Sequence, residues 1–348
     1  MTDPTVTTIL PTFRRPRLLK RAIESFIGQT YRHSQLYVCD NASGDATERV
    51  VRAYAAVDPR INYHCHGSNI GLGRNLAFGL DRVTTQYFSV LSDDDWLLPD
   101  FYRMAVRALE SRPDAAFVST RVIHVDDDAR VVRTDDITCG RGGVFPSPDR
   151  LVALLEQGIP IWTGTLFRTS MVSAIGGLDS ETGTVGDVDL FCRLAAQHPF
   201  MVEPKPGAVF SRRRNSISGQ VRLSSTWPGW LKMMENVSHH ESISHGAGEH
   251  VEYILVRQLV TRLYGIGLVS SRLGNFDDAI QAAGLLAGRY RQQRKADAIR
   301  LFVFMFRHFP LLRRIVPRVG KGHLDYLRLG WRNTPIRIDA YLAQLGTS

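Results

Sequence analysis

The chain has 348 residues, 44% of them hydrophobic and 22% charged, with a formal net charge of +9 at pH 7. This composition is that of a globular protein rather than a disordered one, and the length allows one large or two ordinary domains. No run of about 18 apolar residues occurs, residues 1–8 lack the features of a signal peptide, and the four cysteines have no paired spacing. A transmembrane helix, a secretory leader and a disulfide framework are therefore not expected, and a reducing compartment is favoured.

Apolar, β-favouring runs alternate with helical patterns over the first 120 residues. The expected strands are at residues 5–10, 35–39, 61–64, 87–91 and 115–119, and the expected helices are at 17–27, 46–56, 71–80 and 99–109. This alternation is typical of an α/β, Rossmann-like fold, in which a mostly parallel sheet has helices on both faces. Ligands bind such sheets outside the carboxyl ends of the strands.

The alternation is less regular after residue 120. A hairpin is expected around the solvated turn at residues 126–128, followed by a loop at 140–148. The later expected elements are helices at 150–156, 169–174 and 187–197 and strands at 161–167, 200–203 and 208–210.

Residues 221–348 are expected to be all-helical, with helices at 252–268, 277–287 and 296–306. The charge balance changes at the same point. Residues 1–220 hold 25 basic and 25 acidic residues, whereas residues 221–348 hold 18 basic and 9 acidic ones, which gives the whole net charge of +9. We therefore predict two domains, a catalytic one at 1–220 and a helical one at 221–348.

Three consecutive carboxylates, Asp93, Asp94 and Asp95, follow the apolar strand expected at residues 87–91. Adjacent like charges repel one another, and a hard divalent cation such as Mg²⁺ or Mn²⁺ with substrate phosphates would relieve that repulsion. The alternative is a solvated turn, because Asp is common in turns.

Six short segments together resemble the catalytic domain of the family 2 glycosyltransferases, which have the GT-A fold. They stand in the family's order and cover roughly the first 220 residues. They are residues 10–16 (LPTFRRP), 39–45 (CDNASGD), 69–75 (NIGLGRN), 91–96 (LSDDDW), 176–179 (GGLD) and 186–190 (GDVDL).

This resemblance implies inverting transfer of a sugar from a nucleotide sugar to an acceptor hydroxyl, assisted by Mg²⁺ or Mn²⁺. It assigns Asp95 or Asp94 to the metal and Asp93 to the ribose, and the register within the run stays open by one residue. Asp40 corresponds to the carboxylate that contacts the nucleobase, and Thr12 and Phe13 would flank the base. Phe13 could equally be a core residue.

Two arginines are further candidates for the donor site. Arg74 corresponds to a family arginine that touches the donor or braces the acidic run, although it could be a cation on a helix surface. Arg213 lies where the family often has a histidine-containing loop, and with no histidine present it could meet phosphate instead.

Asp187 corresponds to the family's catalytic base, although Gly186 replaces the glutamate that commonly precedes it. The alternative for Asp187 is a first-turn carboxylate that complements the helix dipole. Asp189 is a nearby competitor for the role of base and a candidate acceptor contact. Trp162 would line the acceptor site or pack in the core.

The motif of processive family members is not found, so single addition is favoured over polymer synthesis. The expected partners are a UDP- or dTDP-linked donor and a carbohydrate or lipid-linked acceptor. Two alternatives remain, a sugar-phosphate nucleotidyltransferase and a nucleotide-sugar-binding module without turnover. A dinucleotide oxidoreductase is not favoured, because Leu76 replaces a glycine of that fingerprint.

Residues 289–337 hold 13 basic and 2 acidic residues, interleaved with an aromatic-rich apolar stretch. This pattern favours peripheral contact with an anionic membrane, and its alternative is a helix packed on the catalytic domain. The expected location is cytoplasmic, including the inner face of the membrane. No nucleic-acid motif is found, and the helix at 252–268 could pair with a second copy of the chain.

Overall fold

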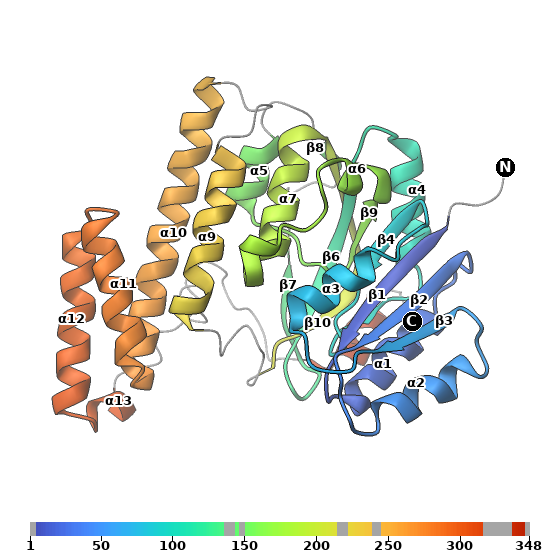
Figure 1. Ribbon diagram of the computed structural model, residues 1–348, viewed down its shortest axis with the longest axis horizontal. Helices are drawn as coiled ribbons and strands as arrows, with labels where there is room; N and C mark the ends of the chain where they lie inside the picture. The colour runs from blue at the N-terminus through green and yellow to red at the C-terminus, as the bar shows by residue number, and fades with distance from the viewer. Residues whose placement is uncertain are drawn as a thin grey trace.

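The computed structural model describes residues 5–135, 143–145, 150–213, 222–238, 245–315 and 336–344. An α/β region built on one sheet lies beside a group of helices from the C-terminal part of the chain (Figure 1). This arrangement confirms the predicted fold class. The bounds of the strands are β1 (Val6–Thr12), β2 (Ser34–Asp40), β3 (Ile61–Cys65), β4 (Tyr87–Val90), β5 (Trp96–Leu97), β6 (Phe117–Val125), β7 (Val131–Asp135), β8 (Gly143–Phe145), β9 (Thr165–Arg168) and β10 (Phe200–Ser211).

The sheet of the described residues has the order β3-β2-β1-β4-β9-β6-β10-β5, with β7 paired to β6 and β8 to β10. Strands β1 to β4 pair in parallel, as do β6 and β10, whereas β9 runs antiparallel between β4 and β6. The sheet is mostly parallel, as predicted, so several strands deliver their carboxyl ends to one edge.

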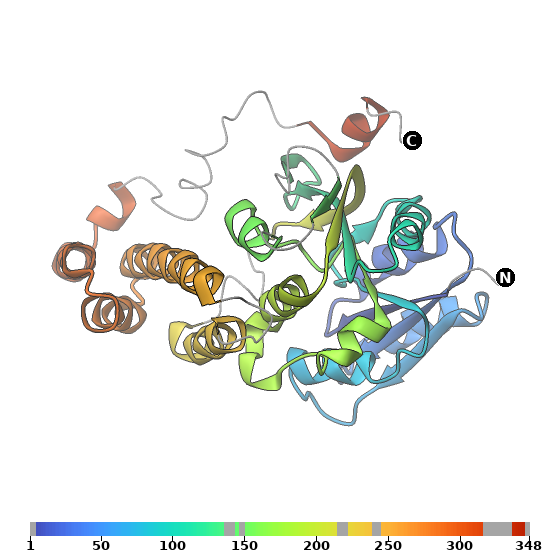
Figure 2. The same cartoon turned by 90° about the horizontal axis from the view of Figure 1, so that it is seen from above.

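Helices cover both faces of the sheet, as the view from above shows (Figure 2). On one face, α1 (Pro16–Ile27), α2 (Thr47–Ala55) and α4 (Phe101–Ser111) pack around Leu10, Leu36 and Tyr87. The apolar side chains of α1 recur every three or four residues, which buries one stripe of the helix. The opposite face is covered by α3 (Leu72–Leu80), α5 (Arg150–Gln157), α6 (Thr169–Ala174) and α7 (Gly186–Gln197), and the short 3₁₀ helix η1 (Ser180–Val185) leads into α7.

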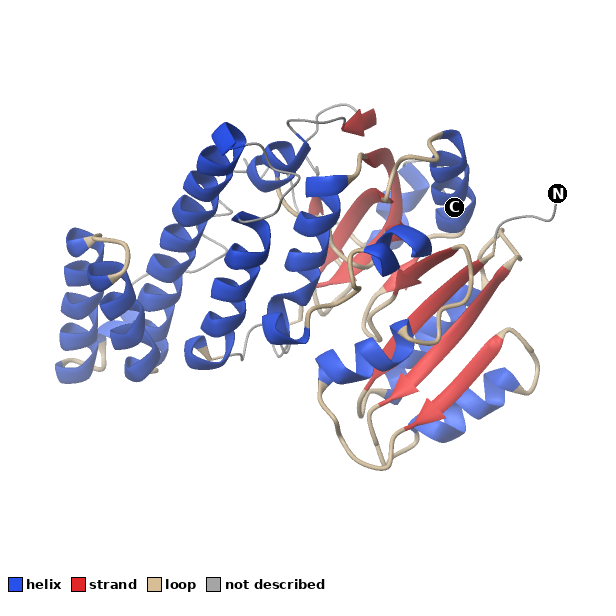
Figure 3. Ribbon diagram, turned by 45° about the horizontal axis from the view of Figure 1, so that its top comes forward, coloured by secondary structure: helices blue, strands red, loops and turns tan. Residues whose placement is uncertain are grey.

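The helical region shares the core of that second face. Its helices are α9 (Leu223–Ser238), α10 (His245–Leu273), α11 (Phe276–Gly288), α12 (Gln293–His308), α13 (Leu312–Ile315) and α15 (Ile338–Gln344). Helices α7, α9 and α10 lie side by side, and α12 lies far from the sheet (Figure 3). In the described part of the chain, the helices are too short or too polar to pass through a bilayer.

The last described segment returns to the α/β region. Ile338 packs beside Val125 and Val209, and the backbone N–H of Val131 donates to the carbonyl of Ile336 at 2.8 Å. The division into domains near residue 220 stays a prediction.

Several elements differ between the prediction and the structure. The strand expected at 161–167 begins only at Thr165. The strands expected at 200–203 and 208–210 are one strand, β10, with irregular register around Pro206, where a ladder N–H is missing. Helix α9 was not predicted, because it contains Pro228 and Gly229, which disfavour a helix in isolation. Most of the loop predicted at 140–148 lies outside the described residues; of its part that is described, 143–145 forms strand β8.

Candidate active site

The acidic turn after β4 is braced by side chains from β1 and α1. The Thr12 hydroxyl donates to the Asp93 carboxylate at 2.9 Å. The Arg15 guanidinium lies 3.1 Å from carboxylate oxygens of both Asp93 and Asp94. The guanidinium carbon of Arg21 lies 3.8 Å from the centre of the Trp96 ring, and the guanidinium donates to the backbone carbonyl of Asp94. Two cations therefore partly neutralise three adjacent carboxylates, as the repulsion among them requires.

The three carboxylates differ in what surrounds them. Asp95 is fully buried, and its two oxygens accept hydrogen bonds from the Ser211 backbone N–H at 2.8 Å and the Thr163 hydroxyl at 2.7 Å. The side chain of Asp94 is 14% exposed. Burial raises the pKa of Asp93 to about 6 and that of Asp95 to about 8, and the neighbouring Asp94 charge adds to the shift in both.

A cation at this turn would have few protein ligands. The described residues contain no group of three or more His, Cys, Asp or Glu side chains suited to a metal. Mg²⁺ and Mn²⁺ with nucleotide phosphates commonly need only one or two carboxylates. The partly exposed Asp94 fits that need, whereas Asp95 has both oxygens engaged by the protein.

Asp40 lies at the end of β2, paired in register with Thr12 at the end of β1. Its carboxylate accepts from the N–H and hydroxyl of Ser43 at 2.9 and 2.6 Å and from the Tyr63 hydroxyl at 2.7 Å. Phe13 is half-buried, with the Arg14 guanidinium 5.1 Å from its ring. The three residues predicted to hold the nucleobase thus lie at neighbouring strand ends.

The two predicted donor arginines lie in different settings. Arg74 is exposed on the first turn of α3. Arg213 follows β10 and forms an ion pair with Asp127 at 3.5 Å, and its charge also acts on Arg21, beneath the acidic turn. Arg213 therefore acts electrostatically on Arg21, which donates to the Asp94 carbonyl, whereas Arg74 faces solvent. Arg214, next in the chain, lies outside the described residues.

Asp187 is half-buried in the first turn of α7. Its carboxylate accepts from the backbone N–H of Val188 at 2.8 Å. Burial raises the pKa of Asp187, and the N–H groups, the Arg262 charge and a hydrogen bond with the Trp162 side chain oppose that rise. A carboxylate with a raised pKa in a partly desolvated place can act as a general base. Trp162 also packs near Phe167 and Phe191, so it borders both Asp187 and the core.

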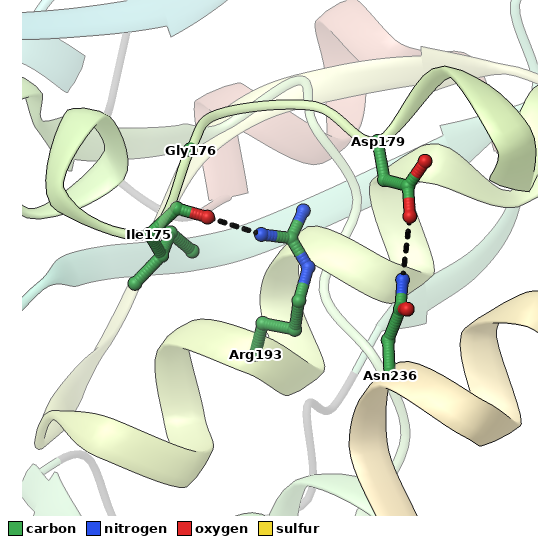
Figure 4. Close-up of a pocket in the computed structure, with 5 residues that line it drawn as sticks. All are labelled: Ile175, Gly176, Asp179, Arg193 and Asn236. Carbon is green, nitrogen blue, oxygen red and sulfur yellow. Dashed lines mark hydrogen bonds between the residues drawn. The ribbon is translucent and has the colours of Figure 1, made fainter. Parts of the chain in front are cut away.

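Asp189, two residues further along α7, is fully buried, and both of its carboxylate oxygens accept hydrogen bonds. Arg193 forms an ion pair with it at 2.6 Å, and the Asn236 amide of α9 donates to it at 2.9 Å. Arg193 also donates to the carbonyls of Ile175 and Gly177. Arg193 and Asn236 also line a pocket of about 350 Å³ together with Ile175, Gly176 and Asp179. Figure 4 shows their side chains directed to the loop that contains Asp179. The geometry favours an anchoring role for Asp189.

Two consecutive residues join the acidic turn to Asp187. Thr163 donates to Asp95, and Trp162 contacts Asp187. Residues from distant parts of the sequence therefore meet around one place at the carboxyl edge of the sheet.

Several residues of this site have no recognisable signal in the sequence. Arg15 lies within the family-like segment at residues 10–16, but nothing in the sequence marks it as the partner of Asp93 and Asp94. Thr163 and Ser211 bind Asp95 from 68 and 116 residues away, and Arg262 belongs to the helical region. No local sequence pattern predicts contacts between residues that lie so far apart in the chain.

Residues 7–176 match the family model described as "Glycosyl transferase family 2". "Putative glycosyltransferase EpsE" of Bacillus subtilis is 28% identical over 198 residues, 55% of this chain and 66% of that protein. A Campylobacter jejuni protein, "GalNAc(5)-diNAcBac-PP-undecaprenol beta-1,3-glucosyltransferase", is 35% identical over 96 residues, 27% of this chain and 31% of that protein. The matches thus span less than two thirds of these relatives.

Solved structures share the fold at low sequence identity. S. aureus TarS 1-349 in complex with UDP-GlcNAc has a TM-score of 0.68 at 13% identity, covering 87% of this chain and 92% of that one. "Mannosyltransferase PcManGT from Pyrobaculum calidifontis in complex with GDP-Man and Mn2+" has a TM-score of 0.50 at 18% identity, covering 87% and 88%. Coverage of 87% extends beyond residue 220, so the likeness includes part of the helical region.

Proposed function

We propose that the chain, whose residues 7–176 match the model of glycosyl transferase family 2, transfers one sugar from a nucleotide sugar to an acceptor hydroxyl with inversion. The observation that carries the proposal is the contact of Trp162 with Asp187 and of Thr163 with Asp95. These contacts hold Asp187 and the acidic turn beside each other. A sugar bound between them would have the base on one side and the diphosphate on the other.

In this proposal Asp187 is the base. Its carboxylate takes the proton of the acceptor hydroxyl as that oxygen attacks the anomeric carbon. The bond from that carbon to the diphosphate oxygen breaks on the opposite face, so the configuration inverts. The Val188 N–H and the neighbouring Trp162 side chain would orient the carboxylate, and burial keeps its pKa raised, which strengthens it as a base.

The donor would lie along the strand ends. Asp40 would contact the nucleobase, with Thr12 and Phe13 beside it, and Asp93 would bind the ribose. Arg213 would meet the phosphates, and Arg74 would do so only by extending from the surface of α3. The solved relatives bind UDP-GlcNAc and GDP-Man, and we propose a UDP- or dTDP-linked donor with a carbohydrate or lipid-linked acceptor here.

Asp94, with Asp95 as the alternative, would hold an Mg²⁺ or Mn²⁺ ion. Such an ion supplies charge neutralisation to the departing diphosphate. Arg15 contacts Asp93 and Asp94 and would make room for a cation by shifting toward the phosphates, for which a guanidinium is well suited.

A panel of UDP-, dTDP- and GDP-sugars tests the proposal, with and without Mn²⁺. Release of nucleoside diphosphate supports it. Release of pyrophosphate from a nucleoside triphosphate would support a nucleotidyltransferase instead. Thermal stabilisation by a donor without any release would indicate a binding module without turnover.

We also propose that the helical region contacts an anionic membrane surface through α12. Four apolar side chains at or after this helix are 57% to 69% exposed, namely Leu301, Phe304, Phe309 and Leu311. Basic residues such as Arg300 and Arg307 alternate with them. Apolar side chains with basic neighbours suit the interface of an anionic bilayer. Residues 316–335 of the predicted contact segment lie outside the described residues.

A further inference from the structure

The helical region is fixed directly against the helix that carries Asp187. A Cβ atom on Gly229 of α9 would lie 2.1 Å from the carbonyl oxygen of Thr182 in η1, so only glycine permits this approach. Seven residues further along α9, Asn236 donates to Asp179 and to the buried Asp189. Helix α9 is therefore held at two points beside the segment that ends in Asp187.

This contact positions an aromatic ring and a cation. Trp230 follows Gly229 and is almost buried. The Arg262 guanidinium of the neighbouring helix α10 lies 4.2 Å from the centre of the Trp230 ring. Stacking on an indole fixes the plane of a guanidinium and leaves the N–H groups along its edge free to donate.

Arg262 also acts electrostatically on the proposed base. Its charge acts on Asp187, and it is the cation that lowers the pKa of that carboxylate. No salt bridge or hydrogen bond of Arg262 is found within the described residues, and its side chain is accessible to solvent. By contrast Arg15 and Arg21, at the acidic turn, are engaged with Asp93 and Asp94. A stacked, accessible guanidinium beside the base has donors to offer a ligand.

We propose that Arg262, held on Trp230, binds an anionic group of the acceptor, a phosphate or a carboxylate, next to the hydroxyl that Asp187 deprotonates. This inference rests on the proposed function, because it takes the Asp187 side of the site as the acceptor side. The donor diphosphate is assigned to the acidic turn, where Thr163 donates to Asp95. The guanidinium fork matches a planar or tetrahedral oxyanion with two N–H groups.

The test uses the full chain and its own tryptophans as the probe. Glycerol 1-phosphate is titrated against intrinsic fluorescence, with glycerol as the uncharged comparison, for the wild type and for Arg262→Gln, Arg262→Lys and Arg257→Gln. Arg257 is the matched control, since it lies on the same helix with its guanidinium 6.0 Å from the Tyr253 ring. Circular dichroism checks that each variant folds.

We expect glycerol 1-phosphate to cause a saturable change in the tryptophan fluorescence and glycerol to cause none. Arg262→Gln should weaken the binding about tenfold or more, because a charge-assisted pair is lost. Arg262→Lys should bind with intermediate affinity and Arg257→Gln as the wild type does. An equal response in Arg262→Gln and wild type, or no saturable response in the wild type, would overturn the inference. Absence of donor turnover in the wild type would instead count against the proposed function, so the two failures are distinguishable.

Discussion

The Thr163 hydroxyl donates to the Asp95 carboxylate at 2.7 Å, while the residue before it, Trp162, contacts Asp187. One dipeptide thus connects the acidic turn after β4 with the first turn of α7. Because the two carboxylates are tied to neighbouring residues of the same chain segment, their separation is set by the fold. Enzymes that hold reacting groups at a fixed separation react faster, because less entropy is lost on the way to the transition state.

Asp187→Asn should abolish sugar transfer and preserve donor binding. The amide oxygen can still accept from Val188 and Trp162, but it cannot take a proton. Loss of a general base costs about 10²- to 10⁴-fold in rate. Steady-state transfer rates and calorimetry with the nucleotide sugar measure the two effects. Full transfer by this variant would move the base to Asp189 or elsewhere.

Asp189→Asn should lower stability, since it leaves the Arg193 charge buried without its partner. Removing one member of a buried ion pair costs about 3–5 kcal/mol. Unfolding in urea measures the change. The matched control is Asp297→Asn, which breaks the exposed pair with Arg300 on α12 and should have little effect. Equal effects of the two substitutions would contradict the anchoring role.

Asp94→Asn should remove the Mn²⁺-dependent part of nucleotide-sugar binding. The reason is that Asp94 is partly exposed, whereas the oxygens of Asp95 accept from Ser211 and Thr163. Titrations of the nucleotide sugar with Mn²⁺ and with EDTA, carried out in parallel on Asp94→Asn and Asp95→Asn, measure this metal dependence. If only Asp95→Asn removed the dependence, Asp95 would be the ligand and its hydrogen bonds would open on binding.

Stability should fall between about pH 4 and pH 8, in part because of Asp95. Its pKa is raised by burial to about 8, above the value of about 3.9 for an unfolded chain, so the folded state binds the extra proton. The contribution is fully present below pH 4 and is lost as the pH rises through 8. Melting temperatures of the wild type and Asp95→Asn across this range measure it, and the variant should show the flatter profile. Parallel profiles would show that Asp95 is ionised in the folded protein.

Replacing Leu301 and Phe304 together with Gln should reduce cosedimentation with vesicles that contain phosphatidylglycerol. Both side chains are 57% exposed on α12, and burying them in a bilayer interface is favourable. Vesicles of phosphatidylcholine should bind weakly, since they lack the negative charge that attracts Arg300 and Arg307. The control is Val57→Gln, which changes a 79% exposed apolar residue in the α/β region. Unchanged cosedimentation of the double variant would exclude α12 as the contact.

Local chemistry determined much of what could be predicted. The strands and helices from β1 to α4 were predicted within a few residues, because apolar periodicity and turn residues act over a few neighbours in the chain. The acidic run, the motif around Asp40 and the first turn of α7 were found for the same reason. Strand β5, with only two residues, was too short to leave a pattern.

The sequence by itself therefore determined the α/β class, the family resemblance and the set of candidate carboxylates. Only the tertiary structure decided which of these carboxylates keep some exposure, Asp94 and Asp187, and which have both oxygens engaged by the protein, Asp95 and Asp189. It also decided that α9 forms despite Pro228 and that Arg262 meets Asp187. The physical reason is distance along the chain. Burial and hydrogen bonding depend on partners such as Asn236 for Asp189 and Ser211 for Asp95, which lie 47 and 116 residues away and meet only when the chain folds.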